Sequence, residues 1–181
     1  MTWIHTHTGK SLDLLDPLPS QICIEDIAHA LGRICRYTGH SHHFYSVAEH
    51  SVLCSQVVSG GLTLGDGRQL SRQALLHDAT EAYVNDLAAP LKRLLPGYKA
   101  IEARVWEAIA WRFDLPLTLR DEVKLADLRM LATEAPQVLP WPPPRDWALP
   151  IEAVPYDGVE VEYWSPDLAT SRFMRAYEAL S

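Results

Sequence analysis

Apolar residues recur at spacings of three and four along most of this chain, which is the period of a helix that buries one face. The predicted helices are 24–35, 46–58, 68–83, 98–113, 118–131 and 166–177. A short alternating run at 158–164 could add one strand. This pattern predicts an all-α bundle, and the length of 181 residues fits a single domain over 1–181.

Helix boundaries carry local signals. Ser46 and Glu49 have the spacing of a capping box, and the second helix should end at Ser59-Gly60-Gly61, where a short loop follows. Seven of the 13 prolines lie between Pro136 and Pro155, together with Trp141 and Trp147. We therefore expect an irregular excursion over 136–164, which would form a lid or rim.

Composition limits the classes of protein. No apolar run approaches the ~20 residues of a membrane span, and the N-terminus lacks the pattern of a signal peptide, so we expect a cytoplasmic protein without membrane contact. The net charge of -7 opposes binding to a nucleic-acid backbone, whereas small anions remain compatible with it. Cys23, Cys35 and Cys54 form no CxxC pair and are expected to be buried thiols.

The doublet His77-Asp78 is the sharpest chemical feature. Glu81 follows four residues after His77, which would place it on the same helical face. A buried cluster of this kind needs a partner or a metal to offset its desolvation. His50 and Asp127 are isolated polar residues in apolar stretches, and each could equally be a satisfied core or solvated residue.

Several short stretches add to this set. They are Ala48-Glu49-His50-Ser51, Leu76-His77-Asp78-Ala79-Thr80-Glu81, Asp86 with Pro90-Leu91-Lys92, and Lys124-Leu125-Ala126-Asp127. In this order they resemble the HD-domain metal-dependent phosphohydrolases over most of 24–134. The finer resemblance is to the subgroup with the bacterial 5'-deoxynucleotidase and the phage dATP triphosphohydrolases.

The resemblance implies an HD-domain helical bundle that hydrolyses nucleotides with a divalent metal held by His50, His77, Asp78 and Asp127. Four protein ligands would saturate a tetrahedral Zn²⁺, so six-coordinate Mn²⁺, Co²⁺, Fe²⁺ or Ni²⁺ fits better. The resemblance further implies two catalytic carboxylates. Glu81 would position or deprotonate the attacking water, and Asp86 would protonate or orient the leaving oxygen.

Basic residues are expected to bind phosphate. By resemblance these are Arg33 or Arg36, Lys92 and Lys124, although helix C-terminal arginines often only complement the macrodipole. Two lysines slightly favour triphosphates as well as monophosphates. Tyr37 could stack on base or sugar, or simply cover the end of a helix.

Some alternatives stay open. A histidine among His40, His42 and His43 could recruit a second metal, or the loop could be a solvated turn. The chain could also be a non-catalytic HD domain that senses a nucleotide or metal, but Glu81 and Asp86 favour an enzyme. Base, sugar, metal and a homo-oligomeric state cannot be read from the sequence.

Overall fold

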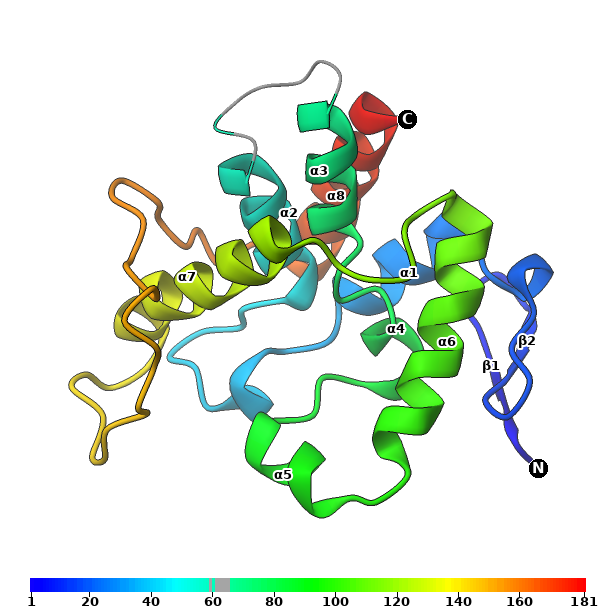
Figure 1. Ribbon diagram of the computed structural model, residues 1–181, viewed down its shortest axis with the longest axis horizontal. Coiled ribbons are helices and arrows are strands. Elements are labelled where there is room, and N and C mark those ends of the chain that lie inside the picture. Colours follow the sequence, from blue (N-terminus) through cyan, green and yellow to red (C-terminus); the bar gives the residue numbers. More distant parts are fainter. Residues whose placement is uncertain (59, 61–65) are drawn as a thin grey trace.

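The computed structural model describes residues 1–58, 60 and 66–181. Within these residues the chain is mostly helical, which confirms the all-α prediction (Figure 1). The helices are α1 (Ile24–Leu31), α2 (Val47–Val58), α3 (Asp66–Leu75), α4 (Glu81–Val84), α5 (Ala89–Leu94), α6 (Tyr98–Phe113), α7 (Asp121–Val138) and α8 (Pro166–Leu180), with 3-10 turns η1 (Pro19–Gln21) and η2 (Tyr37–Gly39). None of the described helices combines the length and the hydropathy that crossing a membrane requires.

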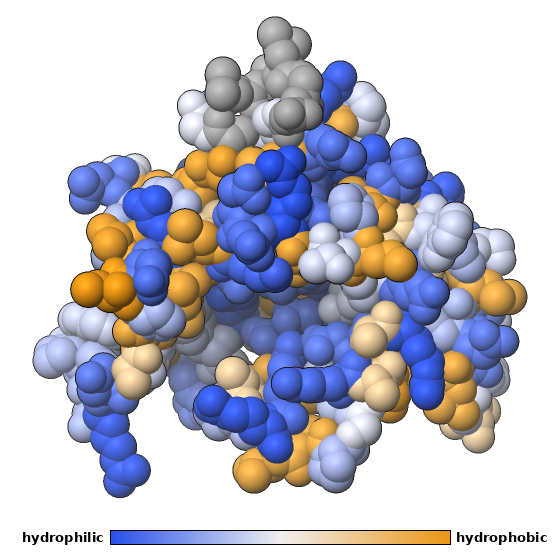
Figure 2. All heavy atoms as spheres, in the orientation of Figure 1, coloured by the Kyte–Doolittle hydropathy of each residue, from blue (hydrophilic) through white to orange (hydrophobic). Residues whose placement is uncertain are grey.

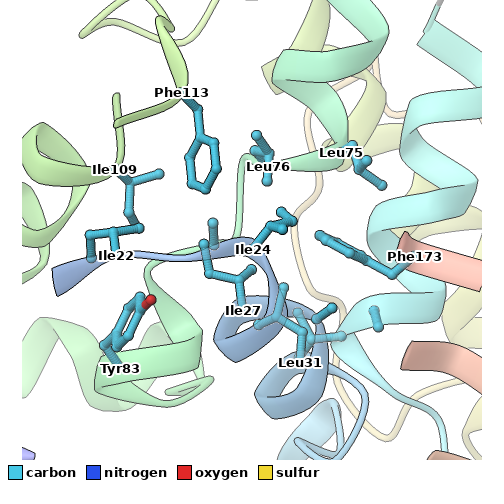
Figure 3. Packing of buried hydrophobic residues seen from close by; sticks show 14 of the residues in the cluster. Ile22, Ile24, Ile27, Leu31, Leu75, Leu76, Tyr83, Ile109, Phe113 and Phe173 are labelled. Atoms are coloured by element: carbon cyan, nitrogen blue, oxygen red, sulfur yellow. The ribbon is translucent and has the colours of Figure 1, made fainter. Parts of the chain in front are cut away.

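Helix α2 lies at the centre of the fold and packs against α3, α7 and α8, while α1 packs against α8 and α4. The main core joins side chains from several of these helices, among them Ile27, Leu75, Ile109, Phe113 and Phe173 (Figure 3). Full burial of each such side chain contributes roughly 1.5–3 kcal/mol. This core fixes α2 and the turn after α3, the two elements that carry the candidate site.

Helix α1 ends at Leu31, four residues before the end of the predicted helix 24–35. The next residue, Gly32, lies so close to α8 that an added Cβ would clash with Thr170 Oγ1 and would meet the Pro166 carbonyl oxygen at 2.9 Å. The crossing of α1 and α8 therefore requires a residue without a side chain at this position. Because the helix ends early, Arg36 lies in a loop and not at a helix C-terminus.

The predicted third helix, 68–83, is in fact two helices. α3 ends at Leu75, residues 76–80 form turns, and α4 begins at Glu81. The expectation that His77 and Glu81 share one helical face is therefore wrong. His77 and Asp78 instead lie in the turn, which releases their side chains from the helical period.

Helix α7 continues through Pro136 to Val138, so the irregular excursion begins three residues later than predicted. The segment that follows it, yellow to orange in Figure 1, runs back along α7. Side chains of α7 bind its backbone: Thr133 Oγ1 accepts from Tyr156 N (2.9 Å) and Gln137 Oε1 from Val161 N (3.0 Å).

Residues 158–164 do not form the predicted strand, because side chains take their backbone donors. The buried Glu49 carboxylate accepts from the backbone N–H groups of Glu162 (2.8 Å), Tyr163 (3.1 Å) and Trp164 (2.8 Å). Only half of the predicted capping box forms. Ser46 Oγ accepts from Glu49 N at 3.1 Å, but the Glu49 side chain points to residues 162–164 and not back to Ser46.

Two elements were not predicted. The first is α5, whose start at Ala89 places Pro90 in the first turn, where a missing N–H costs nothing. The second is an antiparallel hairpin of β1 (Trp3–His5) and β2 (Ser11–Asp13). The Asp26 carboxylate binds its connecting segment, accepting from Thr8 N at 2.7 Å and from Thr8 Oγ1 at 2.9 Å.

Of the cysteines, Cys23 and Cys54 are buried as predicted, whereas Cys35 is half-buried and outside a helix. Helix α2 ends at Val58, as the Ser59-Gly60-Gly61 signal predicts. The loop expected after it falls, except for Gly60, outside the described residues.

Candidate metal centre and cleft

Two buried imidazoles converge on one point. His50, on α2, directs Nδ1 to Glu134 Oε1 at 2.6 Å, and His77, in the turn after α3, directs Nδ1 to the Ala74 carbonyl oxygen at 2.6 Å. Because a carbonyl oxygen only accepts, Nδ1 of His77 carries the hydrogen; the carboxylate sets the same tautomer in His50. Nε2 is thereby the nitrogen of each ring that is left to bind a metal ion, and these two nitrogens lie 3.3 Å apart.

Carboxylates lie beside this nitrogen pair. Asp127 Oδ1, on α7, is 3.1 Å from His50 Nε2 and 3.8 Å from His77 Nε2. Asp78 Oδ2 is 3.2 Å from His77 Nε2 and 3.5 Å from His50 Nε2. Two ligands about 2.1 Å from one ion lie roughly 3.0 to 3.4 Å apart in octahedral or tetrahedral geometry. The structure thus brings together all four predicted metal ligands at spacings close to those a bound ion requires.

Cys54, one turn after His50 on α2, is a further member of the cluster that the sequence did not indicate. One ligand atom from each of His50, Cys54, His77 and Asp127 lies within 4.8 Å of the others, so these residues could hold a metal ion. The Cys54 sulfur, however, is 3.5 Å from Nε2 and 3.8 Å from Nδ1 of His50. A sulfur nearly equidistant from both ring nitrogens packs against the ring, away from the Nε2 lone-pair direction. Asp78 does not belong to that group, but its Oδ2 lies 3.2 Å from His77 Nε2 and is a further candidate ligand atom.

Glu134 supports the cluster from behind and was missed by sequence analysis. It is fully buried on α7 and binds four groups: His50, Tyr45 Oη at 2.6 Å, Tyr37 Oη at 3.3 Å and Arg36 Nη2 at 3.3 Å. Burial opposes its charge, but His50 and Arg36 outweigh this and lower its pKa. Its position seven residues after Asp127, on the same helical face, was the available signal.

The charges of the cluster depend on one another. Burial disfavours the charged imidazoles and Arg36 opposes charge on His50, yet the nearby carboxylates hold the pKa of His50 and of His77 well above the ordinary value. Burial also opposes the charge of Asp78, but the His77 imidazolium lowers its pKa to about 2. Protons on the imidazoles therefore balance the acidic charge in the absence of a cation, and a divalent ion would displace them.

A cleft of about 760 Å³ opens over this cluster, within the range of small-ligand sites. Figure 2 shows the hollow near the centre of one face, with hydrophilic side chains gathered in it. Its polar lining includes Arg36, Tyr37, Asp78, Glu81, Asp86, Lys92, Arg93 and Asp127. Five of the predicted catalytic and binding residues thus face one space with two of the predicted metal ligands.

Two carboxyls of the lining, Glu81 and Asp86, lie outside the set of predicted metal ligands. Burial and the neighbouring carboxylates of Asp78 and Asp86 raise the pKa of Glu81 well above its ordinary value, and burial raises the pKa of Asp86. Glu81 Oε2 is buried and has no hydrogen-bond partner among the described residues. Lys92 lies 3.8 Å from Glu81 Oε1 and 3.0 Å from Glu102 Oε1. Raised pKa values of this kind are typical of carboxyls that transfer protons in functional sites.

Tyr37 and the two residues after it form an unusual stretch of backbone. Tyr37 and Thr38 both have φ of 55° and Gly39 has φ of 76°, conformations that non-glycine residues rarely adopt. The hydrogen bond from Tyr37 Oη to Glu134 holds this loop against the metal cluster. The loop thereby ties one wall of the cleft to the same carboxylate that orients His50.

Two predicted phosphate-binding residues, Arg33 and Lys124, do not line the cleft. Arg33 pairs with Asp167 on the surface (2.6 Å), and Lys124 pairs with Asp121 (2.9 Å) on the exposed side of α7. Of the loop histidines only His40 lines the cleft; His43 contacts the ring of Tyr163. In the part of the chain that the structure describes, no second group of candidate ligands forms around these histidines.

Two proteins of other bacteria are similar to most of this chain. The uncharacterized protein YfdR of Escherichia coli K12 is 47% identical over 134 residues, which cover 74% of this chain and 71% of the relative. The chain belongs to the YfdR family. An uncharacterized protein of Rhodobacter capsulatus is 38% identical over 143 residues, 75% of this chain and 72% of its own length. No model of a known protein family matches the chain.

Proposed function

We propose that this member of the YfdR family is an HD-domain phosphohydrolase that uses a divalent transition metal to hydrolyse nucleotide phosphate esters. The observation that carries the proposal is the convergence of two Nε2 nitrogens and two carboxylates beneath a cleft that also holds Glu81, Asp86 and Lys92. A structural cluster would have no need of further ionisable groups facing an open cavity. Perturbed pKa values of Glu81 and Asp86 in that cavity are typical of catalytic groups.

The donor set fits a borderline metal ion. Imidazole nitrogens suit Mn²⁺, Fe²⁺, Co²⁺, Ni²⁺ and Zn²⁺, and the two carboxylates add the hard oxygen ligands that a six-coordinate ion accepts. Bound there, such an ion would polarise the phosphoryl group and make water more acidic. His50, His77, Asp78 and Asp127 would hold it, with Glu134 fixing the tautomer of His50.

The remaining residues supply proton transfer and charge. Glu81 takes a proton from the attacking water as the new bond between oxygen and phosphorus forms. Asp86 gives a proton to the leaving oxygen as the ester bond breaks, so that the nucleoside leaves as a neutral alcohol. Lys92 and Arg36 balance the negative charge of the phosphoryl oxygens, and their own carboxylate partners keep them in place.

The length of the phosphate chain depends on the basic side chains of the cleft. Of the two lysines that favour triphosphates, Lys124 pairs with Asp121 and does not line the cleft. Arg36, Lys92 and Arg93 remain as the basic side chains of the cleft. These groups suffice for a monophosphate, and Arg93 on exposed α5 could reach a longer chain.

A phosphate-release assay tests the proposal. Metal-reconstituted protein is incubated with the deoxynucleoside and ribonucleoside 5'-phosphates of each base, at each phosphorylation level, and the products are separated. We expect release of nucleoside with phosphate or polyphosphate, abolished by a chelator and restored by metal. Tight nucleotide binding without turnover would instead support the alternative function of a nucleotide- or metal-sensing HD domain.

A further inference from the structure

The cleft is lined by apolar as well as ionisable side chains. Four large apolar side chains of the lining come from α7 and the segment after it: Leu131, Leu139, Trp147 and Leu149. We call this set the apolar end. Leu131 lies one helical turn after Asp127 on α7, about 6 Å further along the axis at a rise of 1.5 Å per residue. Leu139 is the first residue after the helix, about 18 Å along the same axis.

A local turn presents Trp147 to the cleft. The Asp146 carboxylate accepts a hydrogen bond from the backbone N–H of Ala148 at 2.9 Å, and Ala148 has φ of 51°. Positive φ in an alanine costs free energy, so the hydrogen bond to Asp146 holds the backbone in a conformation that it would not otherwise prefer. This turn fixes the direction of the two side chains on either side of Ala148, and both of these line the cleft.

The Trp147 ring is partly exposed. Its neighbour Trp141 meets it edge to face, with ring centroids 6.0 Å apart and an interplanar angle of 86°. Trp147 lines the cleft and is 39% exposed, so part of the ring is open to a ligand in the cleft.

Tyr37, another aromatic residue of the cleft, contacts side chains beside the metal cluster. Its hydroxyl donates to Glu134, and the Arg36 guanidinium lies 5.5 Å from its ring centroid. Tyr37 therefore belongs to the metal end, beside the groups that would contact phosphate and sugar. Trp147 is left as the aromatic side chain that a flat apolar group in the cleft can stack on.

We propose that the apolar end is the nucleobase site and that Trp147 stacks on the base, so that residues 139–149 select among bases. The proposal rests on the proposed function, since it places the phosphate at the metal end. An aromatic face binds any base, with about 1–3 kcal/mol per stacked base. Leu131, Leu139 and Leu149 enclose the base and discriminate by shape.

Binding of compounds that cannot be hydrolysed tests the proposal. Deoxynucleosides carry the base without a phosphate, and deoxyribose 5-phosphate carries the phosphate without a base. Trp147→Ala should weaken deoxynucleoside binding about 5- to 150-fold, the range set by loss of one stacking contact. It should leave the affinity for deoxyribose 5-phosphate unchanged, while Trp147→Phe should retain most of the deoxynucleoside affinity.

Trp111 provides a matched control, because it is 71% exposed on α6 and does not line the cleft. Trp111→Ala should bind both compounds like the parent protein. Nucleosides should also quench tryptophan fluorescence in the parent and in Trp111→Phe, but much less in Trp147→Phe. A circular dichroism melt shows whether each variant is folded.

The outcomes separate this inference from the proposed function. Equal weakening of both compounds in Trp147→Ala, or unchanged deoxynucleoside binding, would overturn the nucleobase site even in a protein that releases phosphate. Failure of the parent protein to bind any deoxynucleoside would overturn it as well. Base-dependent binding that requires Trp147, in a protein without turnover, would support the nucleobase site and contradict the proposed hydrolase activity.

Discussion

His50 Nδ1 and Glu134 Oε1 lie 2.6 Å apart, and both side chains are fully buried. The two residues come from different helices, α2 and α7, and their hydrogen bond links these helices. It orients the imidazole so that Nε2 faces Asp127 and His77. A carboxylate behind a metal-binding histidine raises the basicity of the ligand and fixes its tautomer.

This relationship gives the first prediction. Glu134→Gln keeps the shape of the side chain but loses its charge, so metal affinity should fall about 10- to 100-fold, the usual effect of losing such a partner. Isothermal titration with Co²⁺ or Mn²⁺ measures it. Tyr45→Phe removes only one hydrogen bond to Glu134 and should weaken binding less. Parent-like metal affinity in Glu134→Gln would show that the carboxylate serves the fold alone.

The second prediction separates proton transfer from metal binding. Glu81→Gln should keep the metal and bind nucleotide, because Glu81 contacts neither His50 nor His77. Turnover should fall by about 10² to 10⁴, as expected for a lost general acid or base. Steady-state kinetics with parallel metal analysis check this. Parent-like turnover would place the base elsewhere.

The third prediction compares Lys92 and Lys124, both of which are expected from the sequence to bind phosphate. Lys92→Ala removes a half-buried ammonium group from the cleft, and kcat/KM should fall about 10- to 150-fold, since hydrogen bonds to charged groups contribute roughly 1.5–3 kcal/mol. Lys124→Ala changes an exposed pair with Asp121 and should leave kcat/KM within about twofold on monophosphates and triphosphates. A selective loss on triphosphates in Lys124→Ala would contradict its position in the structure.

The fourth prediction concerns pH. His50 and His77 bind metal only as neutral imidazoles, and the nearby carboxylates raise the pKa of both above the ordinary value of about 6.5. Protons therefore compete with the metal, and metal affinity should strengthen as pH rises from about 6 to about 8. Titrations in buffers of different ionisation enthalpy should detect proton release on binding. An affinity that is constant across this range would contradict the assignment of charge.

The sequence predicted most helices because apolar periodicity is a local property. It failed where a distant contact decides the outcome. Helix α1 ends where its backbone packs closely against α8, and the side chains of Glu49 and Gln137 replace the strand partner that residues 158–164 would need. The break of the third predicted helix after Leu75 has no glycine or proline to signal it.

The site shows the same division. His50, His77, Asp78 and Asp127 could be predicted by resemblance, since their order along the chain is distinctive. Glu134 was missed because a single glutamate in a helix usually faces solvent, and only tertiary packing places it behind His50. Trp147 belongs to an irregular segment without periodicity, so nothing local indicates that it faces the cleft.

The central claim is that one metal ion is bound where the two Nε2 nitrogens meet, and metal stoichiometry tests it most directly. The parent protein and the double variant His77→Ala/Asp78→Ala are reconstituted with Co²⁺ or Mn²⁺ and desalted. Their metal content is then measured by mass spectrometry. The account predicts about one ion per parent chain and almost none in the variant, with the helical circular dichroism signal largely retained, because the hydrophobic core does not depend on these two side chains. Stoichiometric metal in the folded double variant would contradict it.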